Sequence, residues 1–480
     1  MKTARLTLPL LPLLILSASA FAADDPALAA RMAAVERGLQ PPVTIQGAQP
    51  VRRVLADEMA RLGVPGVSIA VIHAGEIEWA KGYGAVTPGG AAVTPATLFQ
   101  AASISKPVTA MAALKLVEAG TLALDRDING YTTYWKLPDN AGSGPVTLRQ
   151  LLSHTAGTTV HGFRGYAAGE KIPTLVQLLN GAAPSNSRGV HVSTRPGTKY
   201  RYSGGGYEVV QYVMAERSKQ DFARLVQDTV LKPLGMNDSS FAQPLPPALL
   251  ARAALPHDGQ GKPVAGGPYT YPELAAAGLW TTPTDLAKFA IEMRRSAAGQ
   301  SNKVLSQSMT HLMLTPVLED YGLGWNIEDS GQAQVFAHGG SNIGYQNLLL
   351  AYTERGDGVA VMTNGDRGNE LAGALVRSVA AEYQWPTQHA KVRPAVAVQA
   401  SALQALPGKY TVEGVGDFTV TRAGAGLSLA LRDGPAETLY AAPDGAYFIT
   451  SREAELRFTG TNGEGRLQMS GMDMVFTREK

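Results

Sequence analysis

Residues 99–111 read FQAASISKPVTAM, and this stretch decides the fold of the chain. The apolar residues before Ser103 predict a buried entry to a helix that spans residues 103–119 and ends at Gly120. Ser103 and Lys106 are three residues apart, so they lie one helical turn apart on one face. A serine hydroxyl is a weak nucleophile until a neighbouring base takes its proton. The spacing therefore predicts a nucleophile with an amine beside it, close to the free N–H groups of a helix N-terminus.

Two further motifs follow downstream, Tyr202-Ser203-Gly204 and His338-Gly339-Gly340. Each motif is weak when taken singly, because glycine-rich triplets usually form turns. In this order, and with Ser103 and Lys106 before them, they predict one site that forms an acyl-enzyme. Tyr200 is an alternative to Tyr202 as the phenol of that site.

Strand patterns lie on both sides of a long helical region within the first 385 residues. The predicted strands cover residues 66–72, 77–83, 321–327, 334–337, 346–352 and 358–362. The predicted helices, besides 103–119, cover residues 27–40, 51–62, 148–153, 175–179, 207–217, 222–231, 284–295 and 367–384. This order predicts an α/β (α+β) fold, in which an antiparallel sheet flanked by helices lies beside an all-helical lobe.

The last part of the chain has a different pattern. Eight short strands separated by Gly, Asp and Asn follow one another in residues 403–480, which predicts a small closed β-barrel. Residues 386–402 contain proline and lack a strong period, so we interpret them as a linker. The predicted organisation is a first domain over residues 23–385, this linker, and a barrel domain over residues 403–480.

The N-terminus predicts export. Lys2 and Arg5 precede an apolar run, and the small residues 17–22 that follow resemble a cleavage site, so residues 1–22 are predicted to be a signal peptide cut after Ala22, with Ala20 as the alternative. We therefore expect a periplasmic or secreted protein. A formal net charge of +2 without charge runs argues against nucleic-acid binding, and stable membrane insertion is not expected once the signal is cut. The absence of cysteine excludes thiol catalysis and disulfides.

The motifs and their flanking phrases resemble the serine β-lactamase and penicillin-binding-protein superfamily. The resemblance covers about residues 45–385 and is nearest to the class C β-lactamase, D-aminopeptidase and esterase branch. The phrases that carry it are PGVSIAVIHAGE (65–76), FQAASISKPVTAM (99–111), LRQLLSHTAG (148–157), YRYSGGGY (200–207), GLWTTPTDLAKF (278–289), YGLGWNI (321–327) and HGGSNIGYQNLL (338–349). The C-terminal part is similar to the lipocalin-like domain often fused to such hydrolases.

The resemblance implies a role for each motif. Ser103 would be the nucleophile, and Lys106 and Tyr202 would transfer protons. An unperturbed lysine has a pKa of ~10.4, so Lys106 must be perturbed to act as the base; alternatively it stays charged and lowers the pKa of Tyr202. The backbone N–H groups of Ser103 and Ser341 would form the oxyanion hole, with His338, Gly339 and Gly340 on an edge strand lining the cleft. No cofactor and no metal are expected.

Two departures from the family pattern bear on the substrate. Gly204 stands where β-lactamases usually carry Asn, and His338 stands where they usually carry Lys. Both changes weaken recognition of a β-lactam, because Gly204 has no amide and a neutral imidazole binds a carboxylate less firmly than an ammonium. We therefore expect hydrolysis of small amides or esters, D-amino-acid peptides included. The alternatives are a β-lactamase or D,D-carboxypeptidase, and a sensor that is acylated without turnover. The expected partner is a small molecule or a peptide, peptidoglycan-related peptides included.

Overall fold

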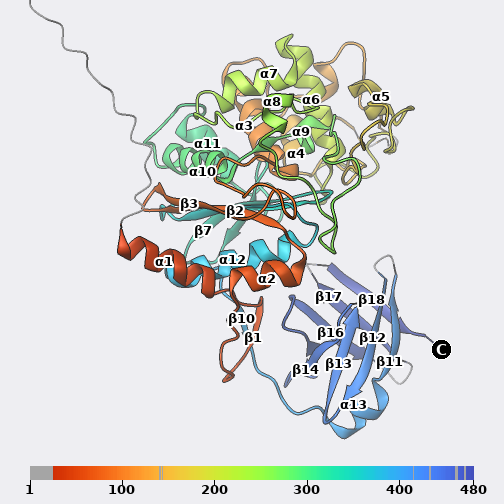
Figure 1. Cartoon of the computed structure of the whole chain (residues 1–480). Coiled ribbons are helices and arrows are strands. Elements are labelled where there is room, and N and C mark those ends of the chain that lie inside the picture. The colour runs from red at the N-terminus through yellow and green to blue at the C-terminus, as the bar shows by residue number, and fades with distance from the viewer. Residues whose placement is uncertain are drawn as a thin grey trace, which may run out of the picture.

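The computed structural model describes residues 25–139, 142, 144–413, 416–431, 434–459, 463–469 and 472–479 (Figure 1). The predicted signal peptide lies outside the described residues. Within the described part, no helix is both long and apolar enough to cross a bilayer.

A six-stranded antiparallel sheet forms the centre of the first domain, in the order β3-β2-β9-β8-β7-β6. Its strands are β2 Gly66–His73, β3 Glu76–Gly84, β6 Asn326–Asp329, β7 Gln334–Asn342, β8 Tyr345–Tyr352 and β9 Gly358–Thr363. Every residue of β9 is buried, which explains its continuous apolar run, because helices cover both faces of the sheet (Figure 1). The predicted mixed fold with an antiparallel sheet is confirmed.

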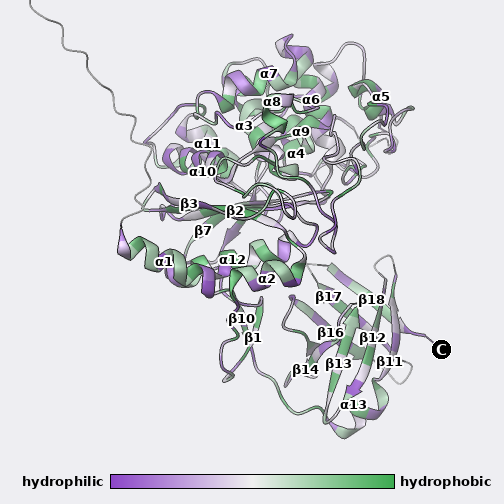
Figure 2. Cartoon of the chain, viewed as in Figure 1, coloured by the Kyte–Doolittle hydropathy of each residue, from purple (hydrophilic) through white to green (hydrophobic). Residues whose placement is uncertain are grey.

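One face of the sheet is covered by three helices from the two ends of the domain, α1 Pro26–Arg37, α2 Leu55–Leu62 and α12 Gly368–Glu382. Leu371, Leu375 and Val379 of α12 pack in one core with the apolar side chains of β2 and β9. Figure 2 shows apolar and polar residues alternating along these helices, as a surface helix with one buried face requires. The other face carries α10 Pro283–Ala297, which contacts β2, β8 and β9.

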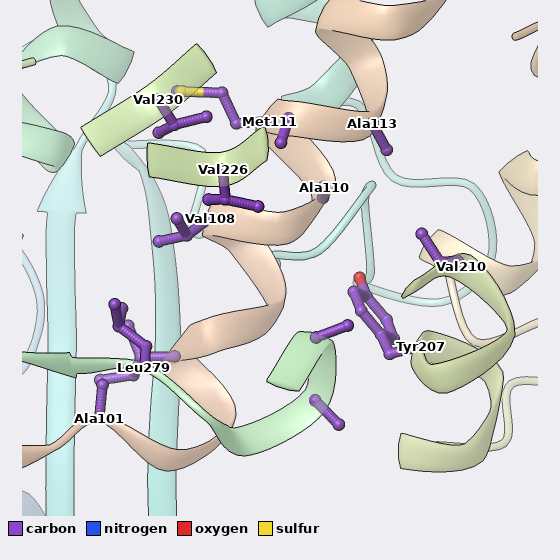
Figure 3. Packing of buried hydrophobic residues seen from close by; sticks show 14 of the residues in the cluster. Ala101, Val108, Ala110, Met111, Ala113, Tyr207, Val210, Val226, Val230 and Leu279 are labelled. Carbon is purple, nitrogen blue, oxygen red and sulfur yellow. The ribbon is translucent and has the colours of Figure 1, made fainter. Parts of the chain in front are cut away.

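The helical lobe lies beyond α10 and surrounds one buried helix. Its principal helices are α3 Ser105–Glu118, α4 Leu148–Leu152, α5 Leu175–Asn180, α6 Gly204–Ser218, α7 Phe222–Val226, α9 Leu274–Ala277 and α11 Gln307–Leu314. In Figure 3, Val108 and Met111 of α3 lie near Val226 and Val230, while Ala110 and Ala113 turn toward Tyr207 and Val210 of α6. Because α3 is packed on several sides, its first turn is held rigidly.

The C-terminal part is a closed barrel of eight consecutive antiparallel strands, as the sequence predicts. The strands are β11 Gly408–Val412, β12 Gly416–Ala423, β13 Gly426–Leu431, β14 Glu437–Ala441, β15 Tyr447–Phe448, β16 Ala454–Thr459, β17 Glu464–Met469 and β18 Met472–Arg478. Tyr410, Phe418, Phe458 and Phe476 pack ring against ring inside it.

A two-stranded ribbon joins the two domains. β1 Val43–Ile45 pairs in parallel with β10 Lys391–Arg393, so part of the expected linker 386–402 is a strand. The helix α13 Ala400–Ala405 also begins within that segment. Val43 packs with Phe448 and neighbouring residues of the barrel in a small core of its own. The barrel is therefore docked through a defined apolar contact.

Candidate active site

Ser103 lies at the end of a tightly held turn. The turn follows β4 Phe99–Gln100 and includes Ala102, whose φ of 51° is left-handed and costs energy for a residue with a Cβ. The Ser105 hydroxyl donates to the Ala102 carbonyl at 2.6 Å and accepts the Leu279 N–H at 3.0 Å. A short 3-10 turn, η1 Ala102–Ile104, then leads into α3 and leaves Ser103 partly exposed. The predicted nucleophile is thus presented on a fixed backbone.

The amine of Lys106 lies beside the hydroxyl of Ser103, as their spacing in the sequence predicts. Its Nζ lies 3.0 Å from Ser103 Oγ and donates to the Ala276 carbonyl at 2.9 Å. Only 2% of Lys106 is exposed, and burial lowers the pKa of its amine to about 7. Near neutral pH a large share of this amine is uncharged, and its lone pair can accept the proton of Ser103.

Tyr202 joins this pair, whereas Tyr200 lies further out. The Lys106 amine lies 4.8 Å from the centre of the Tyr202 ring, and the Ser103 side chain is close enough to act on the pKa of the Tyr202 phenol. Burial raises the pKa of Tyr202, and the influence of Ser103 only partly opposes the rise. Tyr200 packs against His154 and Tyr321. The structure therefore places Tyr202, of the two phenols, against Ser103 and Lys106.

The start of α6 holds Tyr202 in place. Ser203 caps this helix, because its hydroxyl accepts the Gly206 N–H at 3.0 Å and donates to the Thr159 carbonyl at 2.7 Å. The Ser203 N–H donates to Nδ1 of buried His154 at 3.1 Å, so the proton of that imidazole lies on Nε2. Burial holds the pKa of His154 well below its usual value. His154 is thus a neutral structural residue whose ring packs on Tyr202 at 4.2 Å.

Gly204 is covered by an aromatic ring. A Cβ at this position would lie 3.0 Å from Phe163 and 3.2 Å from the His161 carbonyl, which accepts the Gly204 N–H at 2.9 Å. Phe163 therefore occupies space where a larger side chain at position 204 would reach into the cleft. The sequence shows the missing amide at Gly204, but it does not show what replaces it.

His338 lies beside the cleft, and its imidazole is engaged within the protein. Nδ1 lies 2.6 Å from the Gly339 carbonyl, which can only accept, so Nδ1 carries the proton. Nε2 accepts from the Tyr321 hydroxyl at 3.1 Å. Burial, with the nearby amine of Lys106, lowers the pKa of His338 to about 3. The ring is neutral at physiological pH and has no spare N–H for a substrate.

The third motif lies on β7, and the strand has a free edge at this point. The outermost strand is β6, which pairs only with residues 334–337 of β7 and leaves residues 338–342 uncovered. Gly339 and Ser341 are exposed and line the cleft together with Ser103. A Cβ on Gly340 would lie 2.1 Å from the Ala101 carbonyl. This glycine is required by the turn before Ser103, rather than by a substrate as its position in the motif suggests.

The cleft above these residues has a volume of about 980 Å³. Among its described lining residues, Lys106 and Glu328 are the charged ones, and Glu328 is exposed. Met472 of the barrel also lines it, so the second domain contributes to one wall. No group of three or more acidic or histidine side chains in the described residues is placed to hold a metal ion.

Several supporting residues carry no signal in the sequence. Buried Glu208 accepts the Ala276 N–H at 3.1 Å and so orients the residue whose carbonyl binds Lys106. Asn342 donates to the Gln100 side chain and Asn347 to the Gln100 carbonyl, both at 2.8 Å, which ties β7 and β8 to the strand before Ser103. These partners are 68 to 247 residues apart in the chain, so no local motif could reveal them.

Comparison with known proteins relates this site to a family. The sequence model described as Beta-lactamase matches residues 51–384. Protein flp of Staphylococcus aureus (strain N315) is 24% identical over 340 residues, which cover 67% of this chain and 64% of that protein. The chain thus spans less than two thirds of the length of this curated relative.

Two solved structures share the fold. The octameric penicillin-binding protein homologue from Pyrococcus abyssi matches with a TM-score of 0.57 and 22% identity, over 88% of this chain and 98% of that one. The D-amino acid amidase from Ochrobactrum anthropi SV3, complexed with L-phenylalanine amide, matches with a TM-score of 0.56 and 22% identity, over 69% of this chain and 96% of that one. At this identity the likeness concerns the fold alone.

Proposed function

Because the chain belongs to the beta-lactamase family, we propose that it is a serine hydrolase that cleaves small amide or ester bonds through an acyl-enzyme on Ser103. The observation that carries this proposal is the 3.0 Å contact between Ser103 Oγ and a buried amine whose pKa is lowered to about 7. Such a contact supplies a nucleophile together with a base that is partly unprotonated at neutral pH.

The reaction begins when neutral Lys106 takes the Ser103 proton and Oγ attacks the carbonyl carbon of the substrate. The carbonyl oxygen becomes an oxyanion, which the N–H groups of Ser103 and Ser341 stabilise. The proton then passes to the leaving amine or alcohol by way of Tyr202, and the carbon–leaving group bond breaks. A water repeats the cycle on the ester and releases the acid. The raised pKa of Tyr202 supports Lys106 as the base and Tyr202 as the relay.

The charges in the cleft support a substrate without a carboxylate. His338 is neutral, Lys106 is buried behind Ser103, and Glu328 is the exposed charge among the described lining residues. A free amino group is attracted to such a cleft, while the carboxylate of a penicillin finds no cation there. D-amino-acid amides, short D-peptides and small esters fit these charges. The amidase that shares the fold acts on amino acid amides by its name, which agrees with this choice.

The test compares three substrates with wild type and Ser103→Ala. We expect turnover of a p-nitrophenyl ester and of D-alanyl p-nitroanilide, and a loss of at least about 10³-fold in Ser103→Ala. Unchanged hydrolysis in Ser103→Ala refutes the proposal. Fast turnover of a chromogenic cephalosporin, with little turnover of the other two, favours the β-lactamase or D,D-carboxypeptidase alternative. An adduct on Ser103 that persists for hours favours the sensor.

We further propose that the enzyme acts after export, in the periplasm or outside the cell. The charged, apolar and small-residue order of residues 1–22 supports this location. Peptides that carry D-amino acids, such as fragments of peptidoglycan, are substrates of the proposed chemistry in that compartment. N-terminal sequencing of the protein recovered from cells checks the cleavage after Ala22.

A further inference from the structure

A second cavity lies where the first domain meets the barrel. It has a volume of about 180 Å³, and residues 40–42, the α2 helix, the α12 helix and the barrel residues Ser451 and Arg452 form its walls. Asn369 and Gly373 of α12 line both this cavity and the catalytic cleft, so the two spaces are separated by one helix. Nothing in the proposed hydrolysis uses it.

The charges of this cavity are unbalanced. Its lining contains four arginines and two glutamates, which leaves a formal excess of two positive charges; the residues are Arg53, Arg61, Arg377, Arg452, Glu58 and Glu370. Glu58 forms ion pairs with Arg53 at 3.0 Å and with Arg61 at 2.6 Å. Glu370 pairs with Arg367, which lies outside the cavity lining, at 3.0 Å. Both carboxylates are therefore already bound.

The other two guanidinium groups, those of Arg377 and Arg452, form no ion pair within the described residues. Arg377 donates from Nε to the Gln40 carbonyl at 3.0 Å and forms no ion pair. Burial lowers the pKa of Arg377 to about 10, although Glu453 and Glu58 act against the shift. Among the described residues, the side chain of Arg452 has no ion-pair or hydrogen-bond partner, and its Nε is buried. Glu453, the next residue, is paired with Lys391.

Arg377 and Arg452 are both partly buried, and cations that are partly withdrawn from water without an ion-pair partner favour an anion beside them. We propose that this cavity binds a phosphate-class oxyanion, free phosphate or a phosphate monoester, between Arg377 and Arg452. A guanidinium presents a planar fork of N–H donors that matches two oxygens of a phosphate group. The space suffices for that group and a few waters, since one water occupies about 30 Å³ in the liquid.

Because Arg377 and Arg452 belong to different domains, an anion bound between them connects the two domains. Arg377 belongs to the α12 helix, which packs on the central sheet, and Arg452 belongs to the barrel. Such an anion forms a bridge between the domains in addition to their apolar contact at Val43. Ligand that binds only the folded, docked molecule stabilises that state by mass action. The bound anion therefore strengthens the docking of the barrel.

The experiment measures thermal unfolding of the full chain against rising phosphate, with chloride added to hold ionic strength constant. We expect a saturable rise in Tm in wild type, and a half-saturating concentration at least about tenfold higher in Arg452→Gln, because bonds to charged groups are strong. We expect the same weakening of phosphate binding in Arg377→Gln, which removes the guanidinium on the α12 side of the cavity. Arg466→Gln is the matched control, since Arg466 is exposed on the barrel and paired with Asp473.

Parallel titrations with glycerol phosphate distinguish a phosphate monoester from free phosphate as the ligand. A response to phosphate identifies a free anion as sufficient, and a response to glycerol phosphate alone identifies a monoester; both support the site. No saturable response to either probe overturns the proposal. A response that Arg452→Gln and Arg377→Gln leave equal to that of Arg466→Gln overturns it as well.

Discussion

At the scale of single residues, the account rests on a lysine that is charged in water and largely uncharged here. Lys106 is enclosed by α3, α6 and α9, and its amine faces a hydroxyl and a carbonyl instead of water. Burial is the largest cause of its lowered pKa, while the charge of Glu208 acts in the opposite direction. In the proposed mechanism, exclusion of water from Lys106 makes its amine available as the base, and the lowered pKa of this amine determines how activity depends on pH.

The pH profile of kcat/KM distinguishes Lys106 from Tyr202 as the base. With a pKa of about 7, the neutral fraction of Lys106 falls as pH falls, so kcat/KM decreases about tenfold per pH unit below that value and is level above it. The pKa of Tyr202 is raised above its usual value, so a phenolate base predicts activity that still rises above pH 9. Steady-state hydrolysis of the ester between pH 5 and 10 checks this. A further rise in kcat/KM above pH 9 contradicts the assignment of Lys106 as the base.

Glu328 allows a test of substrate charge. We expect Glu328→Gln to raise KM for D-alanyl p-nitroanilide about two- to fivefold, the size of an exposed ion pair, and to leave KM for a neutral ester unchanged. Asp329→Asn on the same strand is the control, because Asp329 does not line the cleft. Equal effects on both substrates show that Glu328 acts on structure and not on the amine.

At the scale of elements, the site depends on how closely β7 approaches the turn before α3. The Ala101 carbonyl lies against Gly340, and Asn342 and Asn347 hold the side chain and backbone of Gln100. The strand that carries Ser341, the proposed oxyanion donor, and the turn that carries Ser103, the proposed nucleophile, are thereby fixed to each other.

A pair of alanine substitutions tests this contact. Gly340→Ala sets a Cβ 2.1 Å from the Ala101 carbonyl, so we expect it to displace the turn, to reduce kcat at least about 10²-fold and to cost about 1–3 kcal/mol of stability. Gly339→Ala meets its nearest atom at 3.8 Å, so its Tm should match wild type. Assays and melting curves of both variants check this, and similar losses in both refute the argument.

The sequence predicted those helices and strands well whose pattern of apolar residues is set within the element itself. The buried helix after Ser103, the hairpin of β2 and β3 and the eight barrel strands all lie near their predicted positions. The strand predicted over residues 321–327 begins only at Asn326, because Gly324, with a φ of 91°, turns the chain against Pro107 and Ala110 of α3. Such a bend is set by a distant helix.

The same reason limits what could be predicted of the site. Ser103 and Lys106 follow from spacing, and Tyr202 follows from its motif. The ring of Phe163 over Gly204, the tautomer of His338 and the support from Glu208 depend on partners far away in the chain. These three features bear on substrate choice and on the base, so fold and nucleophile could be predicted more fully than specificity.

At the scale of the whole molecule, the barrel is attached by more than a covalent connection. The β1–β10 ribbon packs against it, Arg393 pairs with Glu455 at 2.8 Å, and Met472 reaches the wall of the catalytic cleft. The position of the barrel therefore affects the shape of the cleft.

Val43→Asp tests the docking without altering the barrel itself. Val43 is 3% exposed in the contact with Phe448, so a buried carboxylate there should separate the two domains. We expect limited proteolysis within residues 386–402 to become at least about tenfold faster, as the loss of a few kcal/mol implies. Val51→Asp is the control, since Val51 is 52% exposed. Cleavage at the wild-type rate contradicts this view of the junction.

Mass spectrometry of the protein during turnover of a slow ester shows whether Ser103 forms an acyl-enzyme. We expect one added acyl group on the peptide that contains Ser103, formed faster as pH rises through 7 and absent from Ser103→Ala. An acyl group found on another residue, or continued hydrolysis by Ser103→Ala, would contradict it.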